Sequence, residues 1–256
     1  MSSPATTGVN GAYSLPSIGG PYEPKSRQQS RAEATMDAIK AFILQENLLP
    51  GDSLPTETQL CETLGVSRSS VREAIRKLEA LNIVSVEHGK GTFVGSLSLD
   101  PLVQTLAFRA SIYGTEDLRG LSDVVEVRRY LDLGCAEQVV QSLHGTDQPE
   151  LFNYVSVMEE KAKVGHTFEE EDLNFHLGLL ANTANLVVKQ LVHSLWLVHM
   201  AVVPQLGLEI SHRLDDTAHA HRLMLEAAVS GDLKAYREAV LYHYAPLEAI
   251  LRERIQ

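Results

Sequence analysis

The chain has 256 residues, 44% hydrophobic and 21% charged, a composition typical of globular proteins that excludes disorder throughout. No run of about 18 uncharged apolar residues occurs and the N-terminus lacks a secretory pattern, so we expect a cytoplasmic protein without a membrane partner. Two cysteines, Cys61 and Cys135, exclude a disulfide framework and a cysteine-rich zinc site. We expect both to be small core residues.

The formal net charge of −11 is concentrated in the second part of the chain. Residues 1–97 hold 9 Lys/Arg and 10 Asp/Glu, net −1, whereas residues 98–256 hold 13 and 23, net −10. Nine of the ten histidines also follow residue 98. Two regions of different chemistry are predicted, and the near-neutral one remains compatible with DNA because phosphate affinity depends on local positive charge.

The first region begins with residues 1–28, where Ser, Pro, Gly and Thr predominate and predict a disordered tail. Apolar residues at helical spacing predict a helix from Arg31 to near Asn47, followed by a turn at 49–52. These elements open a domain that we place at 29–95.

Two shorter helices and a hairpin follow. The capping-box pattern Thr56–Gln59 predicts a helix of about two turns that ends at Gly65. Ser67 is a suitable N-cap for a third helix that continues to Leu81. Two β-prone runs around a glycine-containing loop at 83–94 predict a β-hairpin. Three helices followed by a hairpin form the plan of a winged helix-turn-helix.

After an expected linker at 96–101, amphipathic patterns extend to the C-terminus without strand signals or internal repeats. Helices are predicted roughly at 102–112, 117–144, 149–163, 168–182, 186–207, 214–229 and 232–253. The expected fold class is therefore mainly α, with an N-terminal winged helix-turn-helix and a C-terminal all-α antiparallel helical bundle at 102–256.

The third predicted helix carries residues suited to DNA. Arg68, Arg72 and Arg76 are spaced four apart, which lines their guanidinium groups along one face. Arginine can bind guanine bidentately in the major groove, and helix N-termini attract phosphates. The small basic hairpin tip at 88–90 suits a minor-groove or phosphate contact. Taken alone, an arginine stripe of this kind is more often a solvated helix face, with Glu73 and Glu79 as partners.

Residues 48–94 resemble the DNA-binding domain of the GntR family of bacterial transcription regulators. The resemblance rests on motifs that occur in order and without gaps: Pro50-Gly51-Asp52, Leu54-Pro55-x-Glu57, Gly65-Val66-Ser67-Arg68, Val71-Arg72-Glu73-Ala74 and the Gly89-x-Gly91 wing. Family members often carry a base-reading arginine directly after the glutamate of the second motif. Thr58 stands there instead, so the operator preference is expected to differ.

The resemblance implies a double-stranded, pseudo-palindromic DNA operator and a set of contacting residues. The implied contacts are recognition by Arg68, Ser69 and Arg72, phosphate binding by Ser67 and Ser70, and minor-groove entry by His88, Gly89 and Lys90.

A second group of residues has metal-ligand character. Asp172 and His176 are four apart in a predicted helix and share a face. His221 and His243 lie in the last two predicted helices, which could run antiparallel and face one cavity. One aspartate and three histidines can hold a divalent ion with open coordination positions. By spacing alone, an Asp-x3-His pair is more often a capped or solvated helix face.

Residues 102–253 resemble, more loosely, the FCD effector domain of the FadR-type GntR subgroup. The matching residues are Glu126-Val127-Arg128, DLNFH at 172–176, Asn185, His221-Arg222-x3-Glu226-Ala227, Gly231-Asp232 and His243, with Asp132 where the usual pattern has Glu. The resemblance implies that Asp172, His176, His221 and His243 ligate a divalent ion, zinc first, with nickel or manganese as alternatives. It also implies an effector site containing Arg128, which would hold a carboxylate bidentately, and Asn185.

Three other histidines of the second region are not interpreted as metal ligands. His193 and His199 flank Trp196 on an apolar helix and are interpreted as lining or packing residues, and His219 as solvent-facing.

The expected function is that of a homodimeric repressor at the nucleoid, controlled by a small carboxylate such as a sugar acid or hydroxy acid bound at the metal. A metal-dependent hydrolase and a metal-ion sensor are the alternatives. The hydrolase is disfavoured because the H-E-x-x-H, G-x-S-x-G and phosphate-loop patterns are absent. We therefore expect no catalytic residues.

Overall fold

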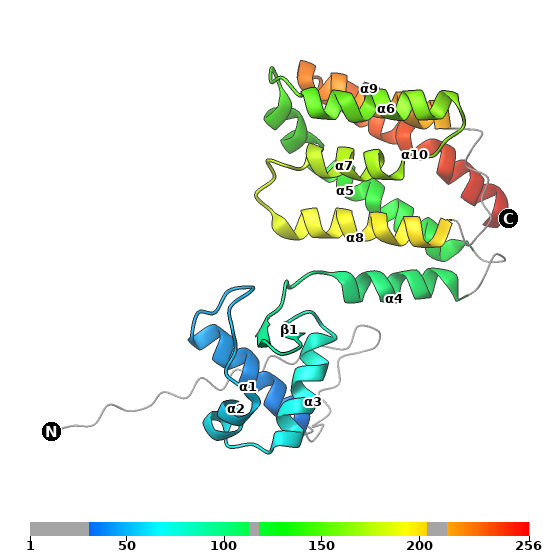
Figure 1. The fold of residues 1–256 in the computed structure, drawn as a ribbon. Helices are drawn as coiled ribbons and strands as arrows, with labels where there is room; N and C mark the ends of the chain where they lie inside the picture. Colours follow the sequence, from blue (N-terminus) through cyan, green and yellow to red (C-terminus); the bar gives the residue numbers. More distant parts are fainter. Residues whose placement is uncertain (1–30, 113–117, 204–213, 256) are drawn as a thin grey trace. The chain divides into compact units, whose positions relative to one another are not determined.

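The computed structural model describes residues 31–112, 118–203 and 214–255. They form two compact units that divide between Ser98 and Leu99, each with its own hydrophobic core. The tail predicted at 1–28 lies outside the described residues. Most described residues are helical and a single small sheet accompanies them (Figure 1), so the mainly-α fold class is confirmed. None of the helices in the described segments has the length and apolarity needed to cross a membrane.

The first unit contains three helices and a hairpin. Its elements are α1 (Arg31–Gln45), α2 (Glu57–Leu64), α3 (Arg68–Glu79), β1 (Val84–Glu87) and β2 (Gly91–Val94). The predicted capping box is present, because the Gln59 backbone N–H donates to the Thr56 hydroxyl and the Thr56 N–H donates to the Gln59 side chain. Gly65 ends α2 in the left-handed region with φ 65.

The third helix begins as predicted and ends earlier than predicted. The Ser67 hydroxyl caps α3 by accepting the Ser70 N–H at 3.2 Å. The helix stops at Glu79 rather than near Leu81, because Asn82 takes φ 54 and the next N–H donates back to the Leu78 carbonyl. This backbone closure resembles a Schellman motif and has no signal in the apolar spacing.

The hairpin is antiparallel, with Val84 opposite Val94 and Glu87 opposite Gly91. A stretch that precedes α2 also lies along β2: the Gly51 N–H donates to the Val94 carbonyl, and the Leu54 N–H to the Thr92 carbonyl. Only a turn was predicted there from the sequence. A single bridge of this kind leaves no period-two pattern, so it could not be predicted from local alternation.

The α2 cap offers a stability prediction. Thr56→Ala removes the acceptor for the Gln59 N–H and is expected to lower the unfolding free energy by about 1 kcal/mol. Thr63→Ala, at an exposed position within the same helix, is the matched control and should cost nothing, because alanine favours helix interiors. Urea unfolding followed by circular dichroism measures both variants. Equal stability of the two would contradict the capping role.

The second unit consists only of helices among its described residues. They are α4 (Asp100–Ser111), α5 (Arg119–Leu143), α6 (Pro149–Lys163), α7 (Glu169–Leu179), α8 (Leu186–Val202), α9 (Leu214–Ser230) and α10 (Leu233–Ile255). All seven predicted helices are confirmed. α7 ends at Leu179 instead of 182, because short backbone turns through Thr183 lead into the cap of α8. The predicted continuation of α8 beyond Val203 lies outside the described residues.

The packing of these helices creates the site. α7 lies between α6 and α8, and α5, α9 and α10 pack against one another beside them (Figure 1). The connection Gly231–Asp232 reverses the chain, with Gly231 at φ 82, so that α10 packs along α9. Four of these helices contribute buried polar or charged side chains to the interior: α5, α7, α9 and α10. Their side chains meet inside the bundle.

Candidate DNA interface and candidate metal centre

In the first unit, α3 presents the predicted recognition residues to solvent. Arg68, Arg72 and Arg76 are exposed, and four residues separate each from the next. At the N-terminus of α3 the Ser67 hydroxyl oxygen lies 2.9 Å from those of Ser69 and Ser70. The three serines therefore form one hydroxyl cluster where the helix N-terminus favours anions.

Arg72 is held by an acidic partner. Its Nε donates to Glu57 Oε2 at 2.8 Å, and this hydrogen bond raises the pKa of the arginine. Glu57, the first residue of α2, therefore fixes the orientation of the Arg72 guanidinium. The next residue, Thr58, is exposed. Bidentate recognition of guanine uses two N–H groups, so the Nε contact leaves the terminal nitrogens for a base. This pairing was not predicted from the sequence.

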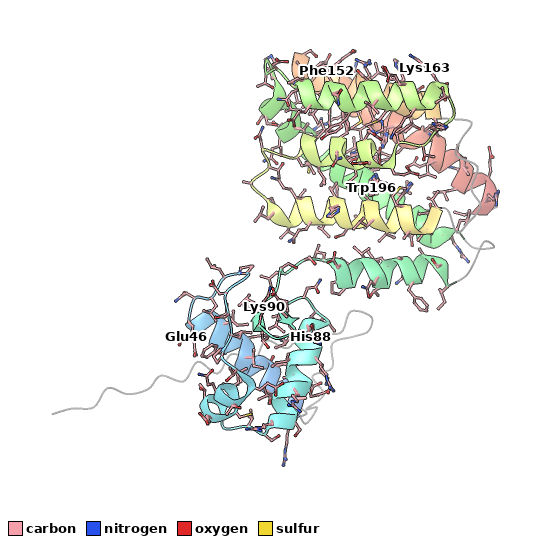
Figure 2. The ribbon with its side chains drawn as sticks, in the orientation of Figure 1. Glu46, His88, Lys90, Phe152, Lys163 and Trp196 are labelled. Atoms are coloured by element: carbon pink, nitrogen blue, oxygen red, sulfur yellow. The ribbon has the colours of Figure 1, made fainter. Side chains whose placement is uncertain are left out.

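The hairpin tip, labelled at His88 and Lys90 in Figure 2, is exposed. Gly89 has φ 78, a left-handed conformation that favours glycine. Lys90 Nζ lies 2.8 Å from Glu87 Oε2, so its charge is partly neutralised within the hairpin. Contact with DNA would exchange this carboxylate for a phosphate.

In the second unit, the four predicted metal ligands come together. One potential ligand atom from each of Asp172, His176, His221 and His243 lies within 4.8 Å of all the others. α7 supplies the first two residues, α9 the third and α10 the fourth. The three histidines are buried, between 0% and 9% exposed.

Asp172 is the centre of this group. Its Oδ1 lies 2.8 Å from His221 Nε2 and 3.7 Å from His176 Nε2. Its Oδ2 accepts a hydrogen bond from the Trp196 indole of α8, a residue labelled in Figure 2. Burial raises the pKa of Asp172, but the surrounding histidines outweigh burial and hold that pKa well below its usual range. The carboxylate is therefore ionised and fixed in orientation.

The hydrogen bonds of the His221 ring indicate that a positive charge is needed between this ring and Asp172. Its Nδ1 lies 2.8 Å from the Thr217 carbonyl oxygen, which can only accept, so Nδ1 carries the proton. Its Nε2 lies 2.8 Å from Asp172 Oδ1, so either a second proton on Nε2 or a cation must separate that nitrogen from the oxygen. Two facing acceptors repel each other unless a proton or a cation lies between them.

Three inward ring nitrogens in this group are buried without a hydrogen-bond partner. They are His176 Nε2, His221 Nε2 and His243 Nδ1. A buried unsatisfied polar atom costs about 1–3 kcal/mol. Burial also lowers the pKa of His176 and of His243, which favours the neutral, ligating form of the ring. A divalent ion with nitrogen and oxygen ligands fits this arrangement.

Arg128 on α5 faces the same group. It is 5% exposed, and its guanidinium carbon lies 5.7 Å from the Tyr244 ring centroid. Its positive charge is among the influences that lower the pKa values of His176 and His243. No salt bridge to Arg128 forms within the described segments. A buried guanidinium without a carboxylate partner is costly, so an anion is a suitable occupant beside it.

Asp132 is a site residue whose part was not predicted. It accepts a hydrogen bond from the Tyr244 hydroxyl at 2.7 Å and lies 3.7 Å from His176 Nδ1. It stands one helical turn after Arg128 on α5, and this spacing was the signal that could have placed it in the site. Its carboxylate faces the side of the His176 ring opposite Asp172.

Asn185 and the remaining histidines lie differently. Asn185 is exposed and caps α8, where its side-chain oxygen accepts the Val187 and Val188 N–H groups. His219 is exposed, as predicted. His199 is partly buried, and its Nδ1 is buried without a partner.

The surroundings of His199 lower its pKa to about 3, first through burial and then through the charge of Arg128. In the unfolded chain the ring titrates near 6.5, so its stability contribution is complete above that pH and is lost as the pH falls toward 3. The metal-free protein is expected to lose up to about 1.4 kcal/mol per pH unit from this group. Denaturant unfolding near pH 7 and near pH 5 should show a shallower dependence for His199→Gln. The exposed His219→Gln is the control, and equal slopes for both variants would contradict the assignment.

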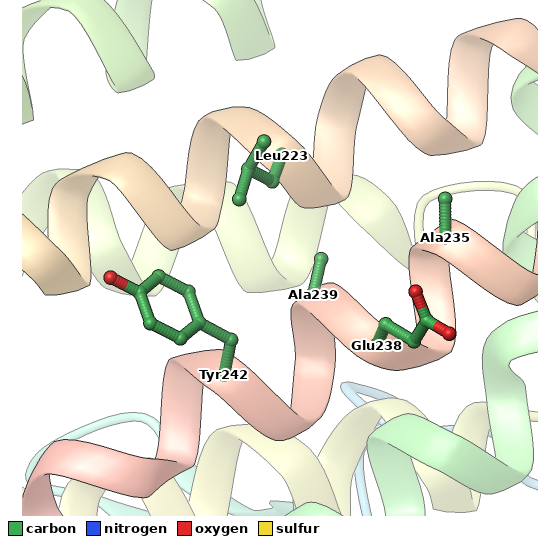
Figure 3. Close-up of a pocket in the computed structure, with 5 residues that line it drawn as sticks. All are labelled: Leu223, Ala235, Glu238, Ala239 and Tyr242. Carbon is green, nitrogen blue, oxygen red and sulfur yellow. The ribbon is translucent and has the colours of Figure 1, made fainter.

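A separate pocket of about 290 Å³ lies between α9 and α10. Leu223, Ala235, Glu238, Ala239 and Tyr242 line it (Figure 3). It contains none of the predicted ligands, and the Tyr242 hydroxyl there donates to Asp216 at 3.3 Å.

Comparisons with known families agree with both units. The model described as bacterial regulatory proteins, gntR family, matches residues 31–94, and the FCD domain model matches residues 123–246.

Individual relatives match most of the chain. The HTH-type transcriptional regulator LutR of Bacillus subtilis (strain 168) is 29% identical over 214 residues, which cover 82% of this chain and 96% of that protein. The galactonate operon transcriptional repressor of Escherichia coli (strain K12) is 24% identical over 211 residues, covering 82% and 92%. A solved GntR structure from Streptococcus agalactiae has 27% identity and a TM-score of 0.59, covering 85% of this chain and 99% of that one. These relatives are named as regulators rather than enzymes, which confirms the non-enzymatic prediction.

Proposed function

The chain is a transcriptional regulator that belongs to the gntR family and carries an FCD domain, and from this we propose that a small carboxylate controls its operator affinity. The carboxylate would bind at a divalent ion held by Asp172, His176, His221 and His243. A sugar acid or a hydroxy acid is the proposed effector class. A relative named as a galactonate operon repressor is consistent with that class.

One observation carries this proposal: three unpartnered buried imidazole nitrogens and one ionised carboxylate converge beside a buried arginine. The ion, when bound, would supply a Lewis acid that accepts a carboxylate oxygen. Arg128 would orient the other carboxylate oxygen by hydrogen bonding. Trp196 holds Asp172 through Oδ2, so Oδ1, which faces the His221 and His176 nitrogens, would be the oxygen that binds the ion. Zinc is the first choice, with nickel and manganese as alternatives.

DNA binding is proposed to use the exposed face of α3 and the hairpin tip. Arg68, Ser69 and Arg72 would read bases, with Arg76 and Thr58 close to the duplex. Ser67 and Ser70 would bind phosphates, and His88, Gly89 and Lys90 would enter the minor groove. A homodimer of the acidic second unit would place two such faces on a pseudo-palindromic operator. Effector binding would then change half-site spacing and release the operator, as expected of a repressor.

The direct test is operator release. A duplex selected by the zinc-loaded protein from a random library is labelled, and its anisotropy is followed during titration with lactate, gluconate, citrate and succinate. We expect at least one acid to weaken binding by roughly 5- to 150-fold, the usual range of allosteric coupling. A chelator should abolish the response. Release that persists without metal would refute the metal-bound effector, and no response to any acid would refute the carboxylate class.

A further inference from the structure

The second unit contains a buried imidazole nitrogen outside the proposed ligand set. His199 Nδ1 is buried without a hydrogen-bond partner, like the inward nitrogens of His176, His221 and His243. His199 is nevertheless not among the four residues whose ligand atoms cluster within 4.8 Å. An ion bound by those four residues would not be a partner for His199 Nδ1. Because buried polar atoms are nearly always hydrogen-bonded, this nitrogen needs another partner.

The position of His199 on α8 indicates where that partner would lie. Trp196 stands three residues earlier on α8, and its indole donates to Asp172, so this helix face is directed at the metal-ligand group. His199 follows one turn later on the same face. The charges of Arg128, Asp172 and His176 also influence its pKa, so the ring lies within electrostatic range of the proposed ligands and of the proposed carboxylate anchor.

We propose that His199 is a specificity-determining residue that hydrogen-bonds a hydroxyl group of the effector. The inference rests on the proposed function, because it assigns a partner to the molecule bound at the metal and Arg128. A carboxylate carried by the ion and the guanidinium would leave its substituents facing α8. The ring would therefore contact the part of the molecule that distinguishes a hydroxy acid from a plain carboxylic acid.

The chemistry of this position favours a hydroxyl over a second carboxylate. The buried Nδ1 of His199 has no hydrogen-bond partner, and a neutral imidazole offers one donor and one acceptor. A hydroxyl matches either nitrogen because it can donate and accept. A second carboxylate would lie near Asp172 and Asp132 with Arg128 already engaged, and its burial would be unfavourable.

The test compares acids that share a carbon skeleton. Calorimetric titration of the zinc-loaded, full-length protein measures the affinities of L-lactate against propionate and of gluconate against hexanoate. We expect the wild-type protein to prefer the hydroxylated member of at least one pair by roughly 10-fold, the worth of one neutral hydrogen bond. His199→Phe, which keeps a ring without nitrogens, should abolish that preference. His199→Gln, which keeps a hydrogen-bonding group, should retain much of it.

Two controls separate a specificity role from a structural one. Zinc affinity should be unchanged in His199→Phe, and the same substitution at His193, elsewhere on α8, should leave the preference intact. An unchanged preference in His199→Phe, a wild-type protein without preference, or loss of zinc from that variant would each overturn the assignment. Failure of every acid to bind the zinc-loaded wild type would refute the proposed function and this inference with it. Binding of both members with equal affinity would refute this inference alone.

Discussion

Replacing His221 with alanine is expected to weaken zinc binding by more than about 100-fold, since even residues that only support metal ligands are worth 10- to 100-fold. His221 is fully buried, its tautomer is set by the Thr217 carbonyl, and its free nitrogen lies 2.8 Å from Asp172. No other described side chain in the group can replace that nitrogen. Competition titration with a zinc chelator of known affinity measures the change.

Two further variants make the His221 result interpretable. His219→Ala changes the same residue type two positions away, at an exposed site, and should bind zinc like the wild-type protein. Asp172→Asn preserves the shape of the ligand but removes its charge, and it should weaken zinc binding without leaving a cavity. Wild-type zinc affinity in both His221→Ala and Asp172→Asn would mean that the cluster is a polar network rather than a metal site.

The second large effect concerns DNA. Arg72→Ala is expected to weaken binding to a selected operator by about 5- to 150-fold while leaving nonspecific duplex binding nearly unchanged. The reason is that Glu57 fixes the Arg72 side chain through Nε, which pre-orders the guanidinium for a base. Anisotropy at one fixed salt concentration measures both duplexes, because phosphate contacts make all affinities salt-dependent.

Arg237→Ala is the matched control for Arg72→Ala. It removes the same charge from an exposed position on α10, outside the proposed DNA interface. We expect its operator affinity to equal that of the wild-type protein. Equal losses in the two variants would indicate a general charge effect, and full operator affinity in Arg72→Ala would contradict the assignment of α3 as the recognition helix.

Local elements could be predicted because their causes are local. The Thr56 capping box, the Ser67 cap and Gly65 at the end of α2 each act within a few residues, and the structure contains all of them. The seven helices of the second unit were likewise indicated by apolar spacing and by breaks such as Gly231–Asp232. The errors fall where backbone hydrogen bonds close a helix without a side-chain signal, as at Asn82 after α3 and at Thr183 after α7.

The partners of several site residues could not be predicted in this way. Asn185 was matched to an effector site by its motif, yet its side chain is engaged as the cap of α8. Arg72 was assigned to DNA recognition by its motif, but its pairing with Glu57 of another helix was not predicted. Asp132 of α5 lies 3.7 Å from His176 Nδ1, although it does not belong to the Asp-x3-His pattern.

The sequence by itself determined the helices, the hairpin, the family and the residue types able to bind DNA or a metal. Only the tertiary structure decided that Asp172, His176, His221 and His243 direct their ligand atoms to one place within 4.8 Å, beside Arg128. Residues four apart share a helix face by geometry, so the Asp172–His176 pair could be anticipated. Residues tens of positions apart meet only through the packing of whole helices, which depends on every side chain at their interfaces.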